Sequence, residues 1–216
     1  MRPGQTVTET WLAETLGVSR TPIRHAISRL SSEGLVIVDR GRIQIRQILI
    51  DEARNLGEFR LAIEGYVARV LARDGMPEGG FTALEKLSTE LAALVTGQGE
   101  CHDFGQFMSF NRAFHLELAR QLGNPMIIDA NTRVHDLLTI TRQTLSEIPG
   151  RPGAILREHA VILVAIRDRD TGAAEAAVAH HILAPLDLYG HEETERYAAA
   201  DTKGVNRGDV GCWSNR

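Results

Sequence analysis

The stretch GVSRTPIRHAISRL, residues 17–30, opens with a glycine and carries three arginines on what its spacing predicts to be one short helix. Its apolar residues recur at i, i+4 and i+7, which places them on one buried stripe: Ile23, Ile27 and Leu30. Arg20 and Arg24 lie four apart on the opposite face, from which both side chains can reach outward. Pro22 is compatible with the helix because the first turn does not need proline's missing N–H. The stretch therefore predicts an amphipathic helix with a basic outer face.

The residues on either side predict a winged helix-turn-helix. Before the arginine helix, residues 8–16 predict a short helix with Thr8 as its N-cap, and Gly17 can end it in the left-handed conformation. After it, residues 33–47 (EGLVIVDRGRIQIRQ) alternate apolar and other side chains around the turn DRGR, which predicts a β-hairpin. In a winged helix-turn-helix the second helix lies in the major groove of DNA.

The charge of the chain is divided unevenly. Residues 1–50 hold seven Arg and four Asp or Glu, a balance of 7 − 4 = +3. The rest holds 17 basic and 24 acidic residues, 17 − 24 = −7, which together give the net charge of −4. A basic first module favours an anionic partner such as nucleic acid. Arginine-rich helix faces that are only solvated are also common, so charge and spacing alone leave both interpretations open.

From residue 50 onward the pattern predicts an all-helical bundle. Breaks rich in glycine or proline separate six predicted helices, at about 51–73, 80–96, 102–122, 125–147, 153–169 and 172–188. Residues 191–216 are polar and without periodicity, so we expect a disordered tail. The sequence thus predicts a mainly α protein with a DNA-binding domain at 1–49, a helical domain at 50–190 and a tail at 191–216.

Composition excludes several classes of protein. A hydrophobic content of 43% and a charged content of 24% are those of an ordinary globular protein. Cys101 and Cys212 are isolated and lack metal-ligand spacing, which argues against a disulfide scaffold. No apolar run approaches the roughly 20 residues that span a bilayer. We therefore expect a cytoplasmic protein without a membrane partner.

Histidines in the helical part have a spacing that suits a metal ion. Asn111 and His115 lie at i, i+4, on one face of a predicted helix. His159 lies 11 residues before Asp170 at the turn of a helical hairpin, and His181 lies 11 residues after it. At 1.5 Å per residue each is about 16 Å along its own arm, so the two are level. Imidazoles at equal height can share one metal ion, although histidines at the polar rim of a bundle are also common.

The segment LAETLGVSRTPIRHAISRLSSEGLV (12–36) closely resembles the winged helix of the GntR family of bacterial transcription regulators. Hydroxyl groups at the start of the second helix can donate to phosphates, and its arginines can bind guanine bidentately. Residues at the tip of the hairpin can contact DNA as the wing. With the family's contact positions, the candidate DNA-binding residues are Ser19, Arg20, Thr21, Pro22, Arg24, Arg40 and Gly41. His25 stands where the family usually has glutamate. The chain starts at MRPG, where family members carry a further helix, so we expect a winged helix-turn-helix lacking the usual first helix.

The helical part resembles the FCD effector domain of the FadR subfamily. The resemblance is carried by EFRLAIEGYVARVLA (58–72), FNRAFHLELARQLGNP (110–125) and the closing helix pair from 158 to 182. In metal-binding members an aspartate and three histidines hold a divalent ion, which in turn holds a carboxylate effector. By resemblance, these metal ligands correspond to Asn111, His115, His159 and His181. Because Asn111 is neutral, we expect weaker metal affinity.

The resemblance implies a ligand-responsive DNA-binding regulator that senses a small carboxylate, an organic or sugar acid, through zinc, nickel or manganese. Arg60, Arg133 and Arg142 are candidate effector-binding residues, since arginine binds carboxylates bidentately, although each can instead form a surface ion pair. A palindromic operator of double-stranded DNA requires a homodimer, and the bundle is the part large enough to supply the interface.

Two alternatives stay open at this point. One is a metal-free regulator with an apolar or acyl-type ligand pocket. The other is a three-histidine zinc enzyme, which needs an open coordination position and a general base. Glu158 and Glu117 are the acidic residues nearest the histidines in sequence, and neither forms a recognisable catalytic motif with them.

Overall fold

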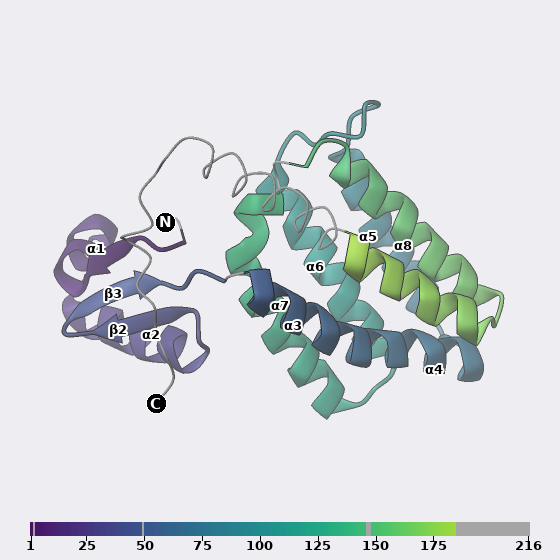
Figure 1. Ribbon diagram of the computed structural model, residues 1–216, viewed down its shortest axis with the longest axis horizontal. Helices are drawn as coiled ribbons and strands as arrows, with labels where there is room; N and C mark the ends of the chain where they lie inside the picture. Colours follow the sequence, from purple (N-terminus) through teal and green to yellow (C-terminus); the bar gives the residue numbers. More distant parts are fainter. Residues whose placement is uncertain (2, 49, 146–147, 185–216) are drawn as a thin grey trace, which may run out of the picture.

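A small head and a larger helical bundle follow one another along the chain (Figure 1). The computed structural model describes residues 1 to 184 except 2, 49, 146 and 147, and it does not describe the side chains of residues 50 and 140–145. We call residues 3–48 the head and the described residues from 50 to 184 the bundle. The predicted tail at 191–216 and the end of the helix predicted at 172–188 lie outside the described residues.

The head contains both predicted helices and the predicted hairpin. Its elements are β1 (Thr6–Thr8), α1 (Glu9–Leu16), α2 (Arg20–Ser32), β2 (Val36–Asp39) and β3 (Arg42–Ile45). Helix α1 begins where the Thr8 hydroxyl accepts a hydrogen bond from the backbone N–H of Trp11, at 3.2 Å. It ends at Gly17, whose φ of 66° lies in the left-handed region. Local capping chemistry therefore sets both ends of α1, as predicted.

Strand β1 is a feature that the sequence pattern did not predict. It pairs with β3 on the side away from β2, so the sheet has the order β1-β3-β2. Val7 lies opposite Ile43, and both are buried. Three residues are too few for an alternating pattern to stand out, so only the pairing reveals the strand. At the hairpin tip Arg40 and Gly41 both have positive φ, 46° and 79°, as two-residue hairpin turns require.

The head has its own apolar core, to which each of its helices and strands contributes. The buried members are Val7, Leu12, Ala13, Ile23, Val36 and Ile43. Of the predicted stripe on α2, Ile23 is buried, whereas Ile27 and Leu30 are half-buried against this core. Because Ile23 anchors α2 from within, the basic face of the same helix points away from the core.

The bundle consists of helices that agree with the predicted ones to within a few residues. They are α3 (Ile50–Arg60), η1 (Leu61–Gly65), α4 (Tyr66–Asp74), α5 (Gly80–Ala93), α6 (Phe104–Gln121), α7 (Pro125–Leu145), α8 (Arg151–Arg167) and a helix at 171–184. The first three form one continuous rod (Figure 1). Its middle, Leu61–Gly65, is a π-helical turn that was not predicted. Such turns occur frequently at functional sites.

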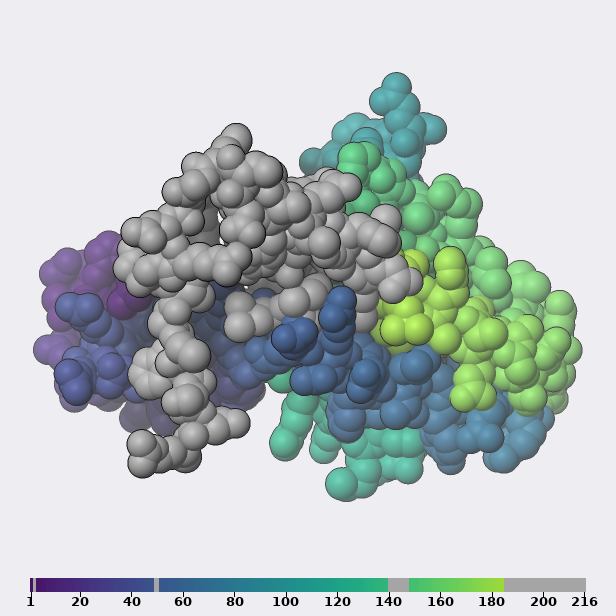
Figure 2. All heavy atoms as spheres, in the orientation of Figure 1, coloured from purple at the N-terminus to yellow at the C-terminus, as the bar shows by residue number. Residues whose placement is uncertain are grey.

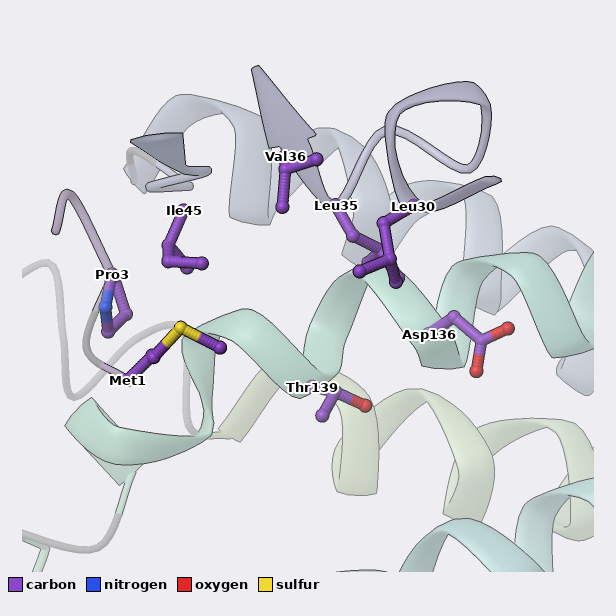
Figure 3. A pocket seen from close by; sticks show the side chains of 8 residues that line it. All are labelled: Met1, Pro3, Leu30, Leu35, Val36, Ile45, Asp136 and Thr139. Carbon is purple, nitrogen blue, oxygen red and sulfur yellow. The ribbon is translucent and has the colours of Figure 1, made fainter. Parts of the chain in front are cut away.

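Helix α7 borders the head. Figure 3 shows apolar side chains of the head, among them Leu30, Val36 and Ile45, facing the stretch of α7 that carries Asp136 and Thr139. The pocket between them has a volume of about 320 Å³. In Figure 2 the head forms one end of the molecule and the bundle the other. Among the described residues, no helix is both long and apolar enough to cross a membrane.

Candidate metal centre and DNA interface

The start of α2 and the hairpin tip form one candidate interface on the head. All the candidate DNA-binding residues there are exposed: Ser19, Arg20, Thr21, Pro22, Arg24, Arg40 and Gly41. Ser19 occupies the N-cap position of α2, and its side chain makes no capping hydrogen bond. The N-terminal end of α2 is open to solvent, which is the arrangement that attracts phosphate.

Glu9 at the start of α1 also belongs to this interface, and sequence reasoning missed it. Its Oε2 atom accepts hydrogen bonds from Arg20 Nη2 at 3.1 Å and from Arg24 Nε at 2.9 Å. The hydrogen bond from Arg24, followed by that from Arg20, lowers the pKa of Glu9. Glu9 lies on a different helix from its partners, so no spacing rule connects them in the sequence.

Four buried histidines from four helices meet inside the bundle. His115 comes from α6, His135 from α7, His159 from α8 and His181 from the helix at 171–184. The ring centroids of His115, His159 and His181 lie 4.8 to 5.1 Å from one another. The helical hairpin brings His159 and His181 level across it, as its arithmetic predicted. The structure therefore brings together the three histidines that the sequence singled out, and adds His135.

Two carboxylates of the bundle hold histidines of this cluster in place. Glu64, from the π-helical turn, lies 2.8 Å from His115 Nδ1 through Oε2 and 2.8 Å from His135 Nε2 through Oε1. Arg60 donates to the same carboxylate with Nε at 2.9 Å and Nη2 at 3.2 Å. Burial acts to raise the pKa of Glu64, but Arg60 and His115 outweigh it and hold that pKa well below its usual range.

The second carboxylate, Glu158, orients His181. Its Oε2 atom lies 2.7 Å from His181 Nδ1, and Arg151 donates to both of its oxygens, at 2.5 and 3.0 Å. Arg151 also donates to the backbone carbonyl of His181 at 3.3 Å. Burial opposes ionisation of Glu158, yet the bonds from His181 and Arg151 lower its pKa to about 2. Sequence reasoning missed Arg151 and considered Glu158 only as a catalytic base.

These contacts fix which nitrogen of each imidazole carries the proton. An ionised carboxylate can only accept hydrogen bonds, so the Nδ1 atoms of His115 and His181 donate. Burial lowers the pKa of both histidines to about 4, so both are neutral at pH 7 and their Nε2 atoms carry lone pairs. These two Nε2 atoms face each other at 3.0 Å. Two facing acceptors repel, and a shared cation would bind both.

His159 also presents nitrogen atoms that a cation could bind. Both of its ring nitrogens lack a hydrogen-bond partner among the described residues, as does Asn111 Oδ1, one helical turn before His115. The ring stacks on Phe114, with centroids 3.8 Å apart, and is buried. Burial, followed by the nearby His181 and His115, holds the pKa of His159 well below its usual range. Unpaired buried polar atoms are rare, so this group fits a divalent ion bound by imidazole nitrogen and amide oxygen.

A second set of possible ligands, Glu64 with His115 and His135, is less suitable. The Glu64 carboxylate already accepts four hydrogen bonds, two from Arg60 and one from each of these histidines. A carboxylate has about four lone-pair sites, so none remains for an ion. Glu64 is therefore an outer support that orients His115, a role common behind histidine metal ligands.

Of the predicted effector-binding arginines, Arg60 lies beside the histidines, because it bonds the same carboxylate as His115. Arg60 is committed to Glu64. Arg133 is exposed and lines a surface pocket with Arg29 and Glu33 of the head, so it faces α2 instead of the cluster. The side chain of Arg142 lies outside those that the structure describes.

The carboxylates near the histidines are not available as a catalytic base. Glu158 is held by Arg151 and His181. Glu117 is bonded to Arg120 at 3.2 Å and to Gln121 at 2.6 Å. In the described part of the chain, these contacts leave neither Glu158 nor Glu117 free to act as the general base that a hydrolytic zinc site needs.

In the absence of metal, the buried histidines should make the protein sensitive to mild acid. The folded-state pKa of His115 and of His181 is about 4, against an unfolded value near 6.5, so the unfolded chain binds more protons between these values. Stability should therefore fall as the pH drops from 6.5 towards 4, by about 3 kcal/mol for one histidine.

Urea unfolding with a chelator present, at pH 7, 6 and 5, measures this loss. An unfolding free energy that stays constant from pH 7 to 5 would show that the histidines are not held neutral by burial.

Comparison with known proteins agrees with the architecture described above. A winged helix-turn-helix joined to a helical bundle defines a class of DNA-binding transcription regulators. Residues 1–42 match the family described as "Bacterial regulatory proteins, gntR family", and residues 55–184 match the FCD domain. The chain belongs to the GntR family of bacterial regulators, in the group that carries an FCD domain. It is a DNA-binding transcription regulator and not an enzyme.

Relatives of this chain include transcription regulators, and a solved structure shares its fold. The chain is 29% identical to an uncharacterized HTH-type transcriptional regulator, YdhC, of Bacillus subtilis, over 83% of this chain and 79% of that one. It is 27% identical to a probable D-xylose utilization operon transcriptional repressor of Paenarthrobacter nicotinovorans, over 87% and 80% of the two chains. The fold resembles that of E. coli McbR/YncC, with a TM-score of 0.75 and 18% identity over 89% and 90% of the two chains.

Proposed function

We propose that this regulator senses a small carboxylate, an organic or sugar acid, through a divalent metal ion held by His115, His159 and His181. The ion would be zinc, nickel or manganese, with the Asn111 carbonyl as a fourth ligand. The observation that carries the proposal is the unpaired state of His159 beside the facing Nε2 lone pairs of His115 and His181. A cation bound between these imidazoles would give each of the buried nitrogen atoms a partner.

The charge around the ion favours an anionic ligand. The three histidines and Asn111 are neutral, and each nearby carboxylate is balanced by its own arginine, Glu64 by Arg60 and Glu158 by Arg151. A bound metal would therefore keep its double positive charge and could hold a carboxylate oxygen. The name of the Paenarthrobacter relative, which ties that protein to D-xylose utilization, supports a sugar-derived acid for this chain.

The residues of this chain act by keeping the ligand atoms ready. Glu64 and Glu158 hold the Nδ1 protons of His115 and His181, so that both Nε2 atoms present lone pairs to the same place. The stacked Phe114 ring fixes the plane of His159. Such preorganisation raises metal affinity because little ordering is left for the binding step.

Helix α7 supports a route from this site to the DNA. It carries Asn131, whose side chain donates to the His115 carbonyl at 3.2 Å, and His135, which contacts Glu64. The next residue, Asp136, lines the pocket at the junction with the head (Figure 3). If α7 can take two positions, an effector that binds the protein more tightly in one of them would favour the arrangement of the head that goes with it.

DNA binding implies a division of the chain into two domains and its assembly as a dimer. We infer a division into a DNA-binding domain at residues 1–49 and a domain for effector binding and dimerisation at 50–190. A two-fold homodimer would place two α2 helices on the half-sites of a palindromic operator. Since bacterial operators lie in the cytoplasm, so would this protein.

DNA binding should depend on the arginines of α2. Replacing Arg24 by alanine should cost about 1–3 kcal/mol in binding to a preferred duplex, because a bidentate arginine–guanine contact is lost. Fluorescence anisotropy on a duplex that the wild-type protein selects from a randomised pool measures this cost. Arg29→Ala is the matched control, since Arg29 lies at the other end of the same helix and pairs with Glu33. Unchanged isotherms for both Arg20→Ala and Arg24→Ala would rule out this interface.

The effector assignment is tested by DNA release. Metal-loaded and chelator-stripped protein are bound to the same selected duplex and titrated with a panel of organic and sugar acids. We expect at least one acid to change the DNA affinity of the loaded protein only. An equal response of the stripped protein would instead favour the metal-free regulator, with the apolar pocket at the head–bundle junction as the place to search.

A further inference from the structure

Glu9 places a negative charge between Arg20 and Arg24 on the candidate DNA interface. Its carboxylate oxygen Oε2 bonds both Arg20 and Arg24, whose side chains are 56% and 62% exposed, while that of Glu9 is 27% exposed. Ion pairs this exposed contribute little to folding, because water screens them. A negative charge here also weakens attraction to phosphates. The arrangement therefore costs electrostatic affinity and contributes little to stability.

The position of Glu9 relative to the arginines is fixed by the core of the head. Thr8 caps α1 immediately before Glu9, and Leu12 of α1 packs in one cluster with Ile23 of α2. The packing of α1 on α2 therefore holds the Glu9 carboxylate between the long side chains of Arg20 and Arg24. The same carboxylate oxygen bonds both guanidinium groups.

The atoms used by these bonds determine which atoms remain for DNA. Arg24 donates to Glu9 through Nε, so its two terminal nitrogens, Nη1 and Nη2, are not used by this bond. The fork of these two nitrogens matches the O6 and N7 acceptors of guanine. Arg20 uses one terminal nitrogen, Nη2, so a different edge of its guanidinium remains. The two arginines are therefore presented to DNA in different orientations.

We propose that Glu9 is a specificity-determining residue of the DNA interface. It orients Arg20 and Arg24 for bidentate contact with bases, and its charge reduces their attraction to phosphate on any sequence. This inference rests on the DNA-binding role of α2. Glu9 itself contacts arginines, and it acts on DNA through them.

The test compares Glu9→Gln with Glu14→Gln, which removes the same charge from an exposed position on the same helix. Each variant is titrated against the duplex that wild type selects from a randomised pool and against a shuffled duplex of equal composition, over a range of salt. We expect Glu9→Gln to bind the shuffled duplex more tightly, with a salt slope steeper by about 1. Its preference for the selected duplex should fall about 10-fold, whereas Glu14→Gln should keep that preference.

A second comparison tests whether Glu9 acts through the arginines. In a protein carrying Arg20→Ala and Arg24→Ala, adding Glu9→Gln should no longer change the preference. Equal losses of preference in Glu9→Gln and Glu14→Gln, or no loss in Glu9→Gln, would overturn the inference. So would a parallel fall of both affinities with the melting temperature, which indicates damage to α1. Failure of the wild type to prefer any duplex would contradict the DNA-reading role of α2 itself.

Discussion

Replacing His159 by alanine should lower the affinity for a divalent ion by more than about 100-fold, since even the loss of an outer support of a metal ligand costs 10–100-fold. The substitution leaves a cavity beside Phe114 and lowers stability, but it breaks no hydrogen bond of the fold, because the two ring nitrogens have no protein partner among the described residues. The fold therefore does not depend on the polar atoms of His159, whereas the proposed metal site does.

The matched control is His180→Ala. His180 lies on the helix at 171–184 beside His181, but its side chain is exposed. Metal content after dialysis against zinc, nickel or manganese, measured by elemental analysis, should drop for His159→Ala and stay at the wild-type value for His180→Ala. Equal metal content in wild type and His159→Ala would show that His159 is not a ligand.

Replacing Arg151 by methionine should lower the unfolding free energy by about 3–5 kcal/mol, the cost of leaving a buried charge without its partner. Arg151 is 5% exposed and holds both oxygens of Glu158, whose side chain is 10% exposed. Without Arg151, the carboxylate would retain only its bond from His181. Urea unfolding curves at pH 7 with a chelator present measure the difference apart from any metal.

Arg167→Met is the control for Arg151→Met, because Arg167 lies on the same helix and pairs with Glu85 but is half exposed. Its loss should cost no more than about 1 kcal/mol. Adding Glu158→Gln to Arg151→Met should restore part of the lost stability, since the unpaired charge is then removed. Equal costs for the two arginine variants would show that the buried pair has no special role.

The head was predictable wherever local chemistry sets the structure. Neighbouring residues determine the cap at Thr8, the end of α1 at Gly17 and the two positive φ values at the hairpin tip. Strand β1 and Glu9 were not predictable, because both depend on partners in other elements. A three-residue strand has no periodicity of its own, and the contact of Glu9 with Arg20 exists only once α1 packs on α2.

The candidate site divides in the same way. Equal spacing of His159 and His181 from the hairpin turn put these two residues level, and the family resemblance added His115. Arg60 and Glu64 have the i, i+4 spacing of a helical ion pair. The contacts of Glu64 and Glu158 with the histidines could not be foreseen, because both resemble ordinary surface glutamates in the sequence. The burial of Glu64 follows from the packing of several helices, including a π-helical turn that the sequence pattern did not predict.

The proposed function requires the acid to bind the metal at the three histidines. The visible absorption spectrum of cobalt-loaded protein can show this binding, because cobalt accepts the same nitrogen ligands and its absorption bands change with its coordination. We predict bands distinct from those of aqueous cobalt, which shift when an acid that alters DNA binding is added. A spectrum that stays unchanged while the acid still alters DNA binding would contradict the proposed function.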